Sequence, residues 1–176
     1  MEDDGPTTIL LFGDINDDII AQACNVIIGE QYRPEPKEKI RIMINSPGGE
    51  LHSAFAILEV MEASKIPIET IAVGQCVSAA LLIFMSGTPG MRIVTRTCTS
   101  MSHTYSTDIG GNHWDLKEIQ KELQNTQDRI LDQYMKCTGL SKQKIMKNLI
   151  GRSDHWLKPQ QVVEYGIADR IGALEF

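Results

Sequence analysis

Residues 68–84 contain two apolar stretches separated by one short run of small residues. The first stretch, residues 68–73, alternates as a strand does and leads into a turn at Ser78. The second stretch is apolar on every side and predicts a buried helix; it contains Leu81, Leu82, Ile83 and Phe84. Because a strand and a helix joined this closely belong to one core, Ser78 is predicted to stand on rigid elements.

The rest of the chain also alternates between strand-like and helical stretches. Residues 8–12 and 40–44 are apolar and strand-like, and residues 33–37 form a proline-containing linker. Asn16 is placed to cap a helix whose first turn carries Asp17 and Asp18. After Gly49, apolar residues recur at helical spacing: Leu51, Ala54, Phe55, Leu58 and Met61. This alternation predicts a layered α/β fold with a largely parallel sheet, in a single domain over residues 1–176.

A long amphipathic helix is predicted from Asp115 to about Lys136. Apolar residues fall roughly on one side of it, at Leu116, Ile119, Leu123, Ile130 and Tyr134. The pattern alone fits an ordinary surface helix as well as a helix with a special role.

Composition excludes several classes of partner and site. The chain has 176 residues and a net charge of -6, so neither nucleic acid nor an anionic membrane is expected as a partner. It has no apolar run of ~18 residues and no N-terminal apolar signal segment, which predicts a cytoplasmic protein. Its four cysteines lack C-x-x-C spacing, so no metal site, disulfide framework or cofactor is expected.

Three polar residues suggest nucleophilic catalysis. Ser78 at a strand-to-helix turn would have an exposed hydroxyl, His103 is a candidate base, and Asp154 is a candidate partner for the imidazole. Gly48 and Gly49 follow the strand of residues 40–44, where main-chain N–H groups can turn toward a ligand. Each motif alone is common in proteins without such chemistry.

The order and spacing of these motifs resemble the ClpP family of serine peptidases, which has the ClpP/crotonase fold. The resemblance covers about residues 9–171 and rests on residues 44–49, Gly74 and Gln75, residues 78–80, residues 101–103, Asp154, and residues 163–169. It implies Ser78 as nucleophile, His103 as general base and then acid, and Asp154 as the partner of His103. It also implies an oxyanion hole formed by the backbone N–H groups of Gly49 and Ala79, and substrate contacts at Leu51 and Ser106. Since a base must be neutral to accept a proton, activity is expected to fall at acidic pH.

Family resemblance also implies an assembly. ClpP-like subunits form heptameric rings stacked in pairs, which cleave peptides without ATP and degrade unfolded proteins that an AAA+ unfoldase feeds to them. The segment at about residues 104–138 would be the handle through which two rings interdigitate.

Three features depart from the family pattern. Only residues 1–7 precede the first strand, so pore gating and unfoldase docking are expected to be altered. Ser153 stands where the family usually has Arg before the triad Asp, and Arg152 is one residue away. Thr104 and Tyr105 replace the usual Gln and Pro after the base, and the following Gly pair comes later, at residues 110–111.

Two other functions stay open at this stage. A crotonase-like enzyme would act on acyl-CoA thioesters, usually through acidic residues without a Ser/His pair. A non-catalytic ring subunit would modify the assembly of active subunits, although such proteins typically lack an intact triad. Cys76 is an alternative nucleophile, and Asp108 and Asp169 are the alternatives to Asp154.

Overall fold

The structure, a computed structural model, describes residues 5–106, 110, 112–151 and 153–174. Its parallel sheet has the strand order β1-β2-β3-β4-β7, and β5 and β6 continue from β3. The strands are β1 (Thr7–Phe12), β2 (Ile40–Ser46), β3 (Ile68–Val77), β4 (Arg92–Thr95), β5 (Thr99–Ser102), β6 (His155–Leu157) and β7 (Arg170–Gly172). All pairs are parallel except β5 with β6. The α/β fold with a largely parallel sheet, predicted from the sequence, is therefore confirmed.

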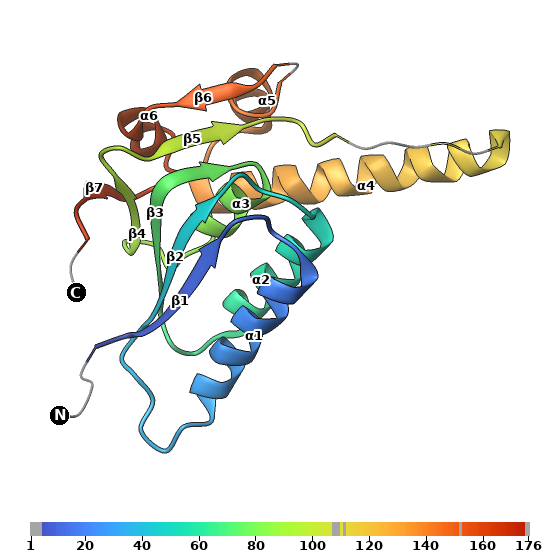
Figure 1. Cartoon of the computed structure of the whole chain (residues 1–176). Coiled ribbons are helices and arrows are strands. Elements are labelled where there is room, and N and C mark those ends of the chain that lie inside the picture. Colours follow the sequence, from blue (N-terminus) through green and yellow to red (C-terminus); the bar gives the residue numbers. More distant parts are fainter. Residues whose placement is uncertain (1–4, 107–109, 111, 152, 175–176) are drawn as a thin grey trace.

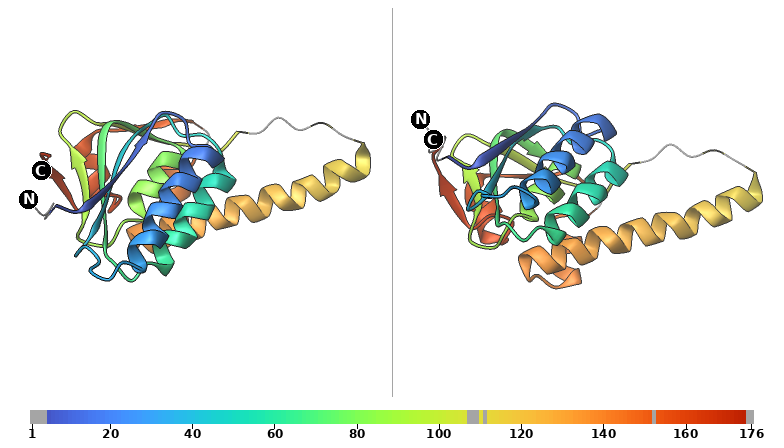
Figure 2. Two further views of the ribbon diagram at one scale, coloured as in Figure 1. Left: turned by 60° about the horizontal axis from the view of Figure 1, so that its bottom comes forward. Right: turned by 90° about the horizontal axis from the view of Figure 1, so that it is seen from below.

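Helices cover one face of this sheet and extend beyond it. They are α1 (Asp17–Gln31), α2 (Leu51–Ala63), α3 (Ala79–Met85), α4 (His113–Thr138), α5 (Lys142–Asn148) and α6 (Pro159–Glu164). The helices α1 and α2 lie side by side against the sheet, and α3 packs on α2 and β3 (Figure 1). The views from other sides in Figure 2 show α4 projecting far from this body. In the described part of the chain, no helix is both long and apolar enough to cross a membrane.

Local signals in the sequence explain where these helices begin. The Asn16 side chain accepts a hydrogen bond from the Ile19 N–H at 3.1 Å and so caps α1 as predicted. Every residue of α3 is buried, which confirms the wholly buried helix expected after Ser78. In α4, the Asn112 side chain accepts from the N–H groups of Trp114 and Asp115, and Gly139 ends the helix with φ +70°.

The longest strand, β3, has two different neighbours along its length. Residues Thr70 to Ala72 pair with β4, whereas Gln75 to Val77 pair with β5. The register with β2 shifts between these halves, because Ile44 lies opposite Ala72 but Ser46 lies opposite Cys76. The strand predicted at residues 68–73 is confirmed, but its alternation does not produce one exposed face: Ile68 to Ala72 are all buried, because β3 is central in the sheet. Because β3 changes its partner from β4 to β5 along its length, β5, with β6 beside it, lies at the carboxyl end of β3.

Candidate active site

Ser78 forms the sharp turn between β3 and α3. Its φ of +56° makes it the one non-glycine residue with positive φ in the described part of the chain. The turn is held by the Ser78 N–H, which donates to Met101 O at 3.0 Å, and by Ser78 O, which accepts from Leu81 and Leu82 N–H. A strained backbone of this kind persists where the surrounding structure requires it, often at functional sites.

The glycines after β2 lie directly against this turn. A Cβ atom on Gly48 would stand 2.8 Å from Ser78 Cβ, and one on Gly49 would stand 2.2 Å from Ile15 O. Their loop is tied down by Ile15 N–H, which donates to Gly48 O at 2.8 Å, and by Glu50 N–H, which donates to Ile15 O at 2.9 Å. Only glycine fits at both positions, since φ is +101° at Gly48 and +148° at Gly49.

Two backbone N–H groups near Ser78 are available to a ligand. Ala79 is the first residue of α3, so its N–H has no acceptor within the helix. Within the described residues, the Gly49 and Ala79 N–H groups have no hydrogen-bond acceptor. These are the two groups that the family resemblance implied as an oxyanion hole.

Strand pairing brings His103 to Ser78. The strands β3 and β5 are parallel and in register, with Val77 opposite Met101, so the residues that follow them leave the sheet at the same edge. His103 Nε2 lies 2.7 Å from Ser78 Oγ, which is within hydrogen-bonding distance. The imidazole side chain is 23% exposed and therefore accessible from solvent.

The antiparallel pair of β5 and β6 brings Asp154 to the other side of the imidazole. Ser102 lies opposite His155, and the next residues outward are His103 and Asp154. Asp154 Oδ1 lies 3.5 Å from His103 Nδ1, close enough for an ion pair when the ring is protonated. The Asp154 side chain is 57% exposed. The structure thus places all three predicted side chains in one row, with the Asp contact longer than the Ser contact.

A groove of about 620 Å³ opens beside this row. Both predicted substrate-binding residues, Leu51 and Ser106, line it. The lining residues that the sequence did not predict as part of the site are Glu50, His52, Tyr105, Ile119, Glu122, Leu123 and Thr126. Periodicity had marked Ile119 and Leu123 as apolar positions of α4, but no local signal indicates that this face of α4 meets the groove.

The alternative nucleophile, Cys76, is unsuited to that role. It is fully buried, and burial, with Cys98 as a smaller cause, raises the pKa of the Cys76 thiol well above its ordinary value. The thiol therefore stays protonated, whereas a nucleophilic cysteine must form a thiolate.

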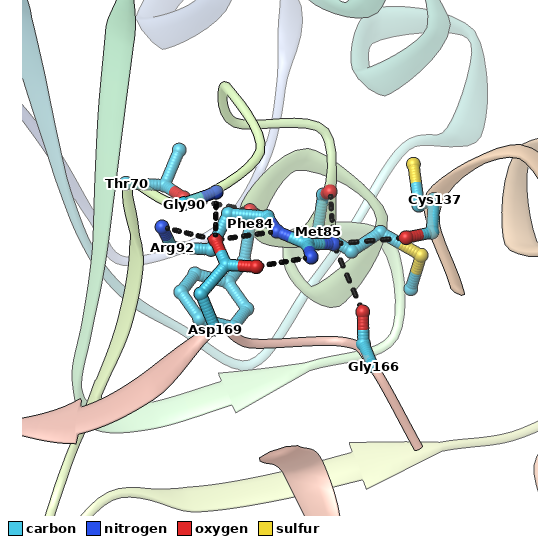
Figure 3. A network of polar contacts seen from close by, with 8 residues as sticks. All are labelled: Thr70, Phe84, Met85, Gly90, Arg92, Cys137, Gly166 and Asp169. Carbon is cyan, nitrogen blue, oxygen red and sulfur yellow. Dashed lines mark hydrogen bonds and ion pairs between the residues drawn. The ribbon is translucent and has the colours of Figure 1, made fainter. Parts of the chain in front are cut away.

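Asp169, an alternative to Asp154, is engaged elsewhere. Its carboxylate binds the Arg92 guanidinium, with Oδ1 2.6 Å from Nη2 and Oδ2 3.0 Å from Nε, and it accepts the Gly90 N–H at 2.7 Å. Figure 3 shows the same guanidinium reaching carbonyl oxygens of Met85, Cys137 and Gly166. This network fastens the end of α3 to α4 and to the loop before β7. The other alternative, Asp108, lies outside the described residues, as do Gly111 and Arg152.

The sequence of this chain matches that of a known protein family. Residues 6–175 match the family model for the Clp protease. The chain belongs to the Clp protease family. This confirms the family resemblance inferred from the motifs around Ser78, His103 and Asp154, and it also supports the mixed α/β fold.

Curated relatives of the Clp protease family agree with this assignment. The chain is 32% identical to an ATP-dependent Clp protease proteolytic subunit of Deinococcus radiodurans over 136 residues, which are 77% of this chain and 66% of that protein. It is 29% identical to the chloroplastic ATP-dependent Clp protease proteolytic subunit 4 of Arabidopsis thaliana, over 93% of this chain and 55% of that protein. A proteolytic subunit from Mesostigma viride is also 29% identical, over 93% of this chain and 70% of that protein.

Proposed function

We propose that this Clp family member is a serine peptidase subunit that hydrolyses peptide bonds with Ser78, His103 and Asp154. The observation that carries the proposal is the 2.7 Å contact between Ser78 Oγ and His103 Nε2 at the edge of an open groove. A hydroxyl within hydrogen-bonding distance of an imidazole, with a carboxylate on the far side of the ring, is the arrangement by which serine is activated.

The reaction follows from the positions of these groups. Ser78 Oγ attacks the peptide carbonyl carbon while His103 Nε2 takes the hydroxyl proton. The carbonyl oxygen gains negative charge, which the Gly49 and Ala79 N–H groups stabilise by hydrogen bonds. His103 then gives the proton to the leaving amine, the C–N bond breaks, and an acyl-enzyme remains. Water then attacks the ester carbon while His103 takes one of its protons. The ester C–O bond breaks, His103 returns that proton to Ser78 Oγ, and the second product leaves.

The assembly and partners belong to the same proposal. The relatives named above are proteolytic subunits of ATP-dependent proteases, so we propose that this chain forms rings with itself and receives unfolded proteins from an ATP-driven unfoldase. Short peptides would enter without ATP. The four cysteines are free, which suits a reducing compartment such as the cytoplasm.

The test is the activity of Ser78→Ala with a short fluorogenic peptide and with a fluorophosphonate, which labels activated serines. We expect the variant to lose both turnover and labelling while its thermal unfolding stays close to that of the original protein. Cys76→Ala is the control, and it should keep both. Labelling that survives in Ser78→Ala would contradict the proposal, and a protein that neither labels nor cleaves would instead be a non-catalytic ring subunit.

A further inference from the structure

Tyr105 stands in the wall between two cavities at Ser78. One is the open groove, and the other is a small apolar pocket of about 10 Å³ beneath it. The two cavities share Leu51, Ser78, His103 and Tyr105 as lining residues. The floor of the small pocket consists of Leu82, Ile130 and Tyr134, all of which are buried.

Hydrogen bonds hold Tyr105 in this position. Its hydroxyl donates to Leu123 O in the middle of α4 at 2.7 Å, and its side chain is half-buried. The preceding Thr104 hydroxyl lies within hydrogen-bonding distance of both Ile150 O, at 2.8 Å, and Gly151 O, at 3.0 Å. Burial, and then the Glu122 carboxylate, raise the pKa of Tyr105, so its hydroxyl remains protonated and continues to donate.

The reaction geometry decides which part of a substrate meets this pocket. The attacked carbonyl carbon must reach Ser78 Oγ while its oxygen faces the Gly49 and Ala79 N–H groups. The side chain of the residue that carries this carbonyl then lies beside Ser78 and His103, which line both the groove and the small pocket. With the Tyr105 ring in place, about 10 Å³ remains, which is room for roughly one water molecule.

We propose that Tyr105 is a specificity-determining residue that limits the residue on the carbonyl side of the cleaved bond to small side chains. The inference rests on the proposed peptidase function and adds its substrate class. Removing the ring joins the pocket to the groove and opens a path to Leu82, Ile130 and Tyr134, an apolar surface that suits a large side chain.

The experiment compares two fluorogenic peptides that differ only in having Ala or Phe before the cleaved bond. The original protein should show at least a tenfold higher kcat/KM for the Ala peptide, since steric differences in a closed pocket give ratios of about tenfold or more. Tyr105→Ala should raise kcat/KM for the Phe peptide at least tenfold, mainly through a lower KM. Tyr105→Phe keeps the ring and should keep the preference for Ala.

Tyr165→Ala is the matched control, because Tyr165 is also a partly buried tyrosine packed on the main core. It should leave the ratio between the two peptides unchanged. A merely structural role for Tyr105 would lower activity on both peptides equally, and that outcome overturns the proposal, as does a preference of the original protein for Phe. Fluorophosphonate labelling distinguishes failure of this inference from failure of the proposed function. If Ser78 is labelled but Tyr105→Ala leaves the ratio of kcat/KM for the two peptides unchanged, only the role of Tyr105 is refuted. A chain without labelling or turnover refutes the peptidase function and this inference together.

Discussion

Each residue of the candidate site is positioned by contacts outside the site. The strained φ of Ser78 is maintained by its N–H bond to Met101 O, and the absence of a side chain on Gly48 allows the loop to approach it. Strain of this kind costs about 1–3 kcal/mol, which the packing of the fully buried α3 and the mostly buried β3 offsets. The nucleophile turn is thus built into the core, whereas Asp154 lies at the surface with a 57% exposed side chain.

Asp154→Asn tests the contribution of that exposed carboxylate. The amide cannot stabilise a protonated imidazole and can hold the ring in the wrong tautomer, a change that costs about 10⁴ in turnover where the carboxylate is buried. Asp154 is exposed, and its Oδ1 lies 3.5 Å from His103 Nδ1. We therefore expect kcat to fall by less than in the buried case, but still by a factor of at least ~10².

Steady-state turnover of a fluorogenic peptide measures this effect. Asp18→Asn makes the same chemical change at an exposed position in the first turn of α1 and should leave kcat unaltered. A kcat for Asp154→Asn within a few-fold of the original value would show that another group orients His103.

At the scale of elements, one buried ion pair connects the end of α3 to its surroundings. The side chains of Arg92 and Asp169 are 8% and 21% exposed, and Arg92 also donates to Met85 O at the end of α3. The Thr70 hydroxyl donates to the neighbouring Phe84 O at 2.8 Å. Since Ser78 directly precedes α3, this network stabilises the helix that follows the nucleophile turn.

Asp169→Asn should lower the free energy of unfolding by about 3 kcal/mol at neutral pH, because it leaves the buried Arg92 charge without its partner. Burial alone would raise the pKa of Asp169, but its hydrogen bonds and the Arg92 charge outweigh burial, and the net pKa lies below the ordinary value. The carboxylate therefore stabilises the fold fully above the ordinary pKa near ~4. That stabilisation is lost as the pH falls through the lower folded value.

Urea denaturation at fixed protein concentration checks both statements, and the difference between the two proteins should shrink on acidification. Asp128→Asn is the control, since Asp128 makes a surface contact with Lys142 at 3.6 Å and should change stability by less than about 1 kcal/mol. A difference that does not vary between pH 7 and pH 3 would contradict the assigned role of the Asp169 charge.

At the scale of the whole molecule, the first half of α4 is largely exposed. Its first turns leave the body (Figure 2), and Trp114 and Leu116 are 70% and 46% exposed. Apolar side chains that project in this way typically mark an interaction surface.

We therefore expect copies of this chain to form heptameric rings that stack into tetradecamers. The balance between heptamers and tetradecamers should depend on salt and on protein concentration. Ser153 carries no charge at the position where the family usually has Arg, so the contact between rings should be weaker than usual. Light scattering across a salt series measures the balance, with Leu116→Glu expected to shift it toward single rings. A monomer at micromolar concentration would contradict the prediction.

The sequence by itself determined the strands β1 to β3, the helices α1 to α4 and the nucleophile turn. The Asn16 cap, the apolar residues of α3 and the small residues before Ser78 act within one or two turns of chain, so their effect can be read locally. Residue type made His103 and Asp154 candidates, and the family resemblance implied their roles, because no local pattern marks them.

Only the tertiary structure decided how those two residues meet. They are brought together by β5 and β6, of which β6 has 3 residues, too few for a hydrophobic pattern to reveal. The groove wall is likewise nonlocal, since Tyr105 reaches Leu123 O across to α4. Pairing between short strands and contacts across the fold depend on which surfaces the rest of the core leaves available, and that is a property of the folded chain as a whole.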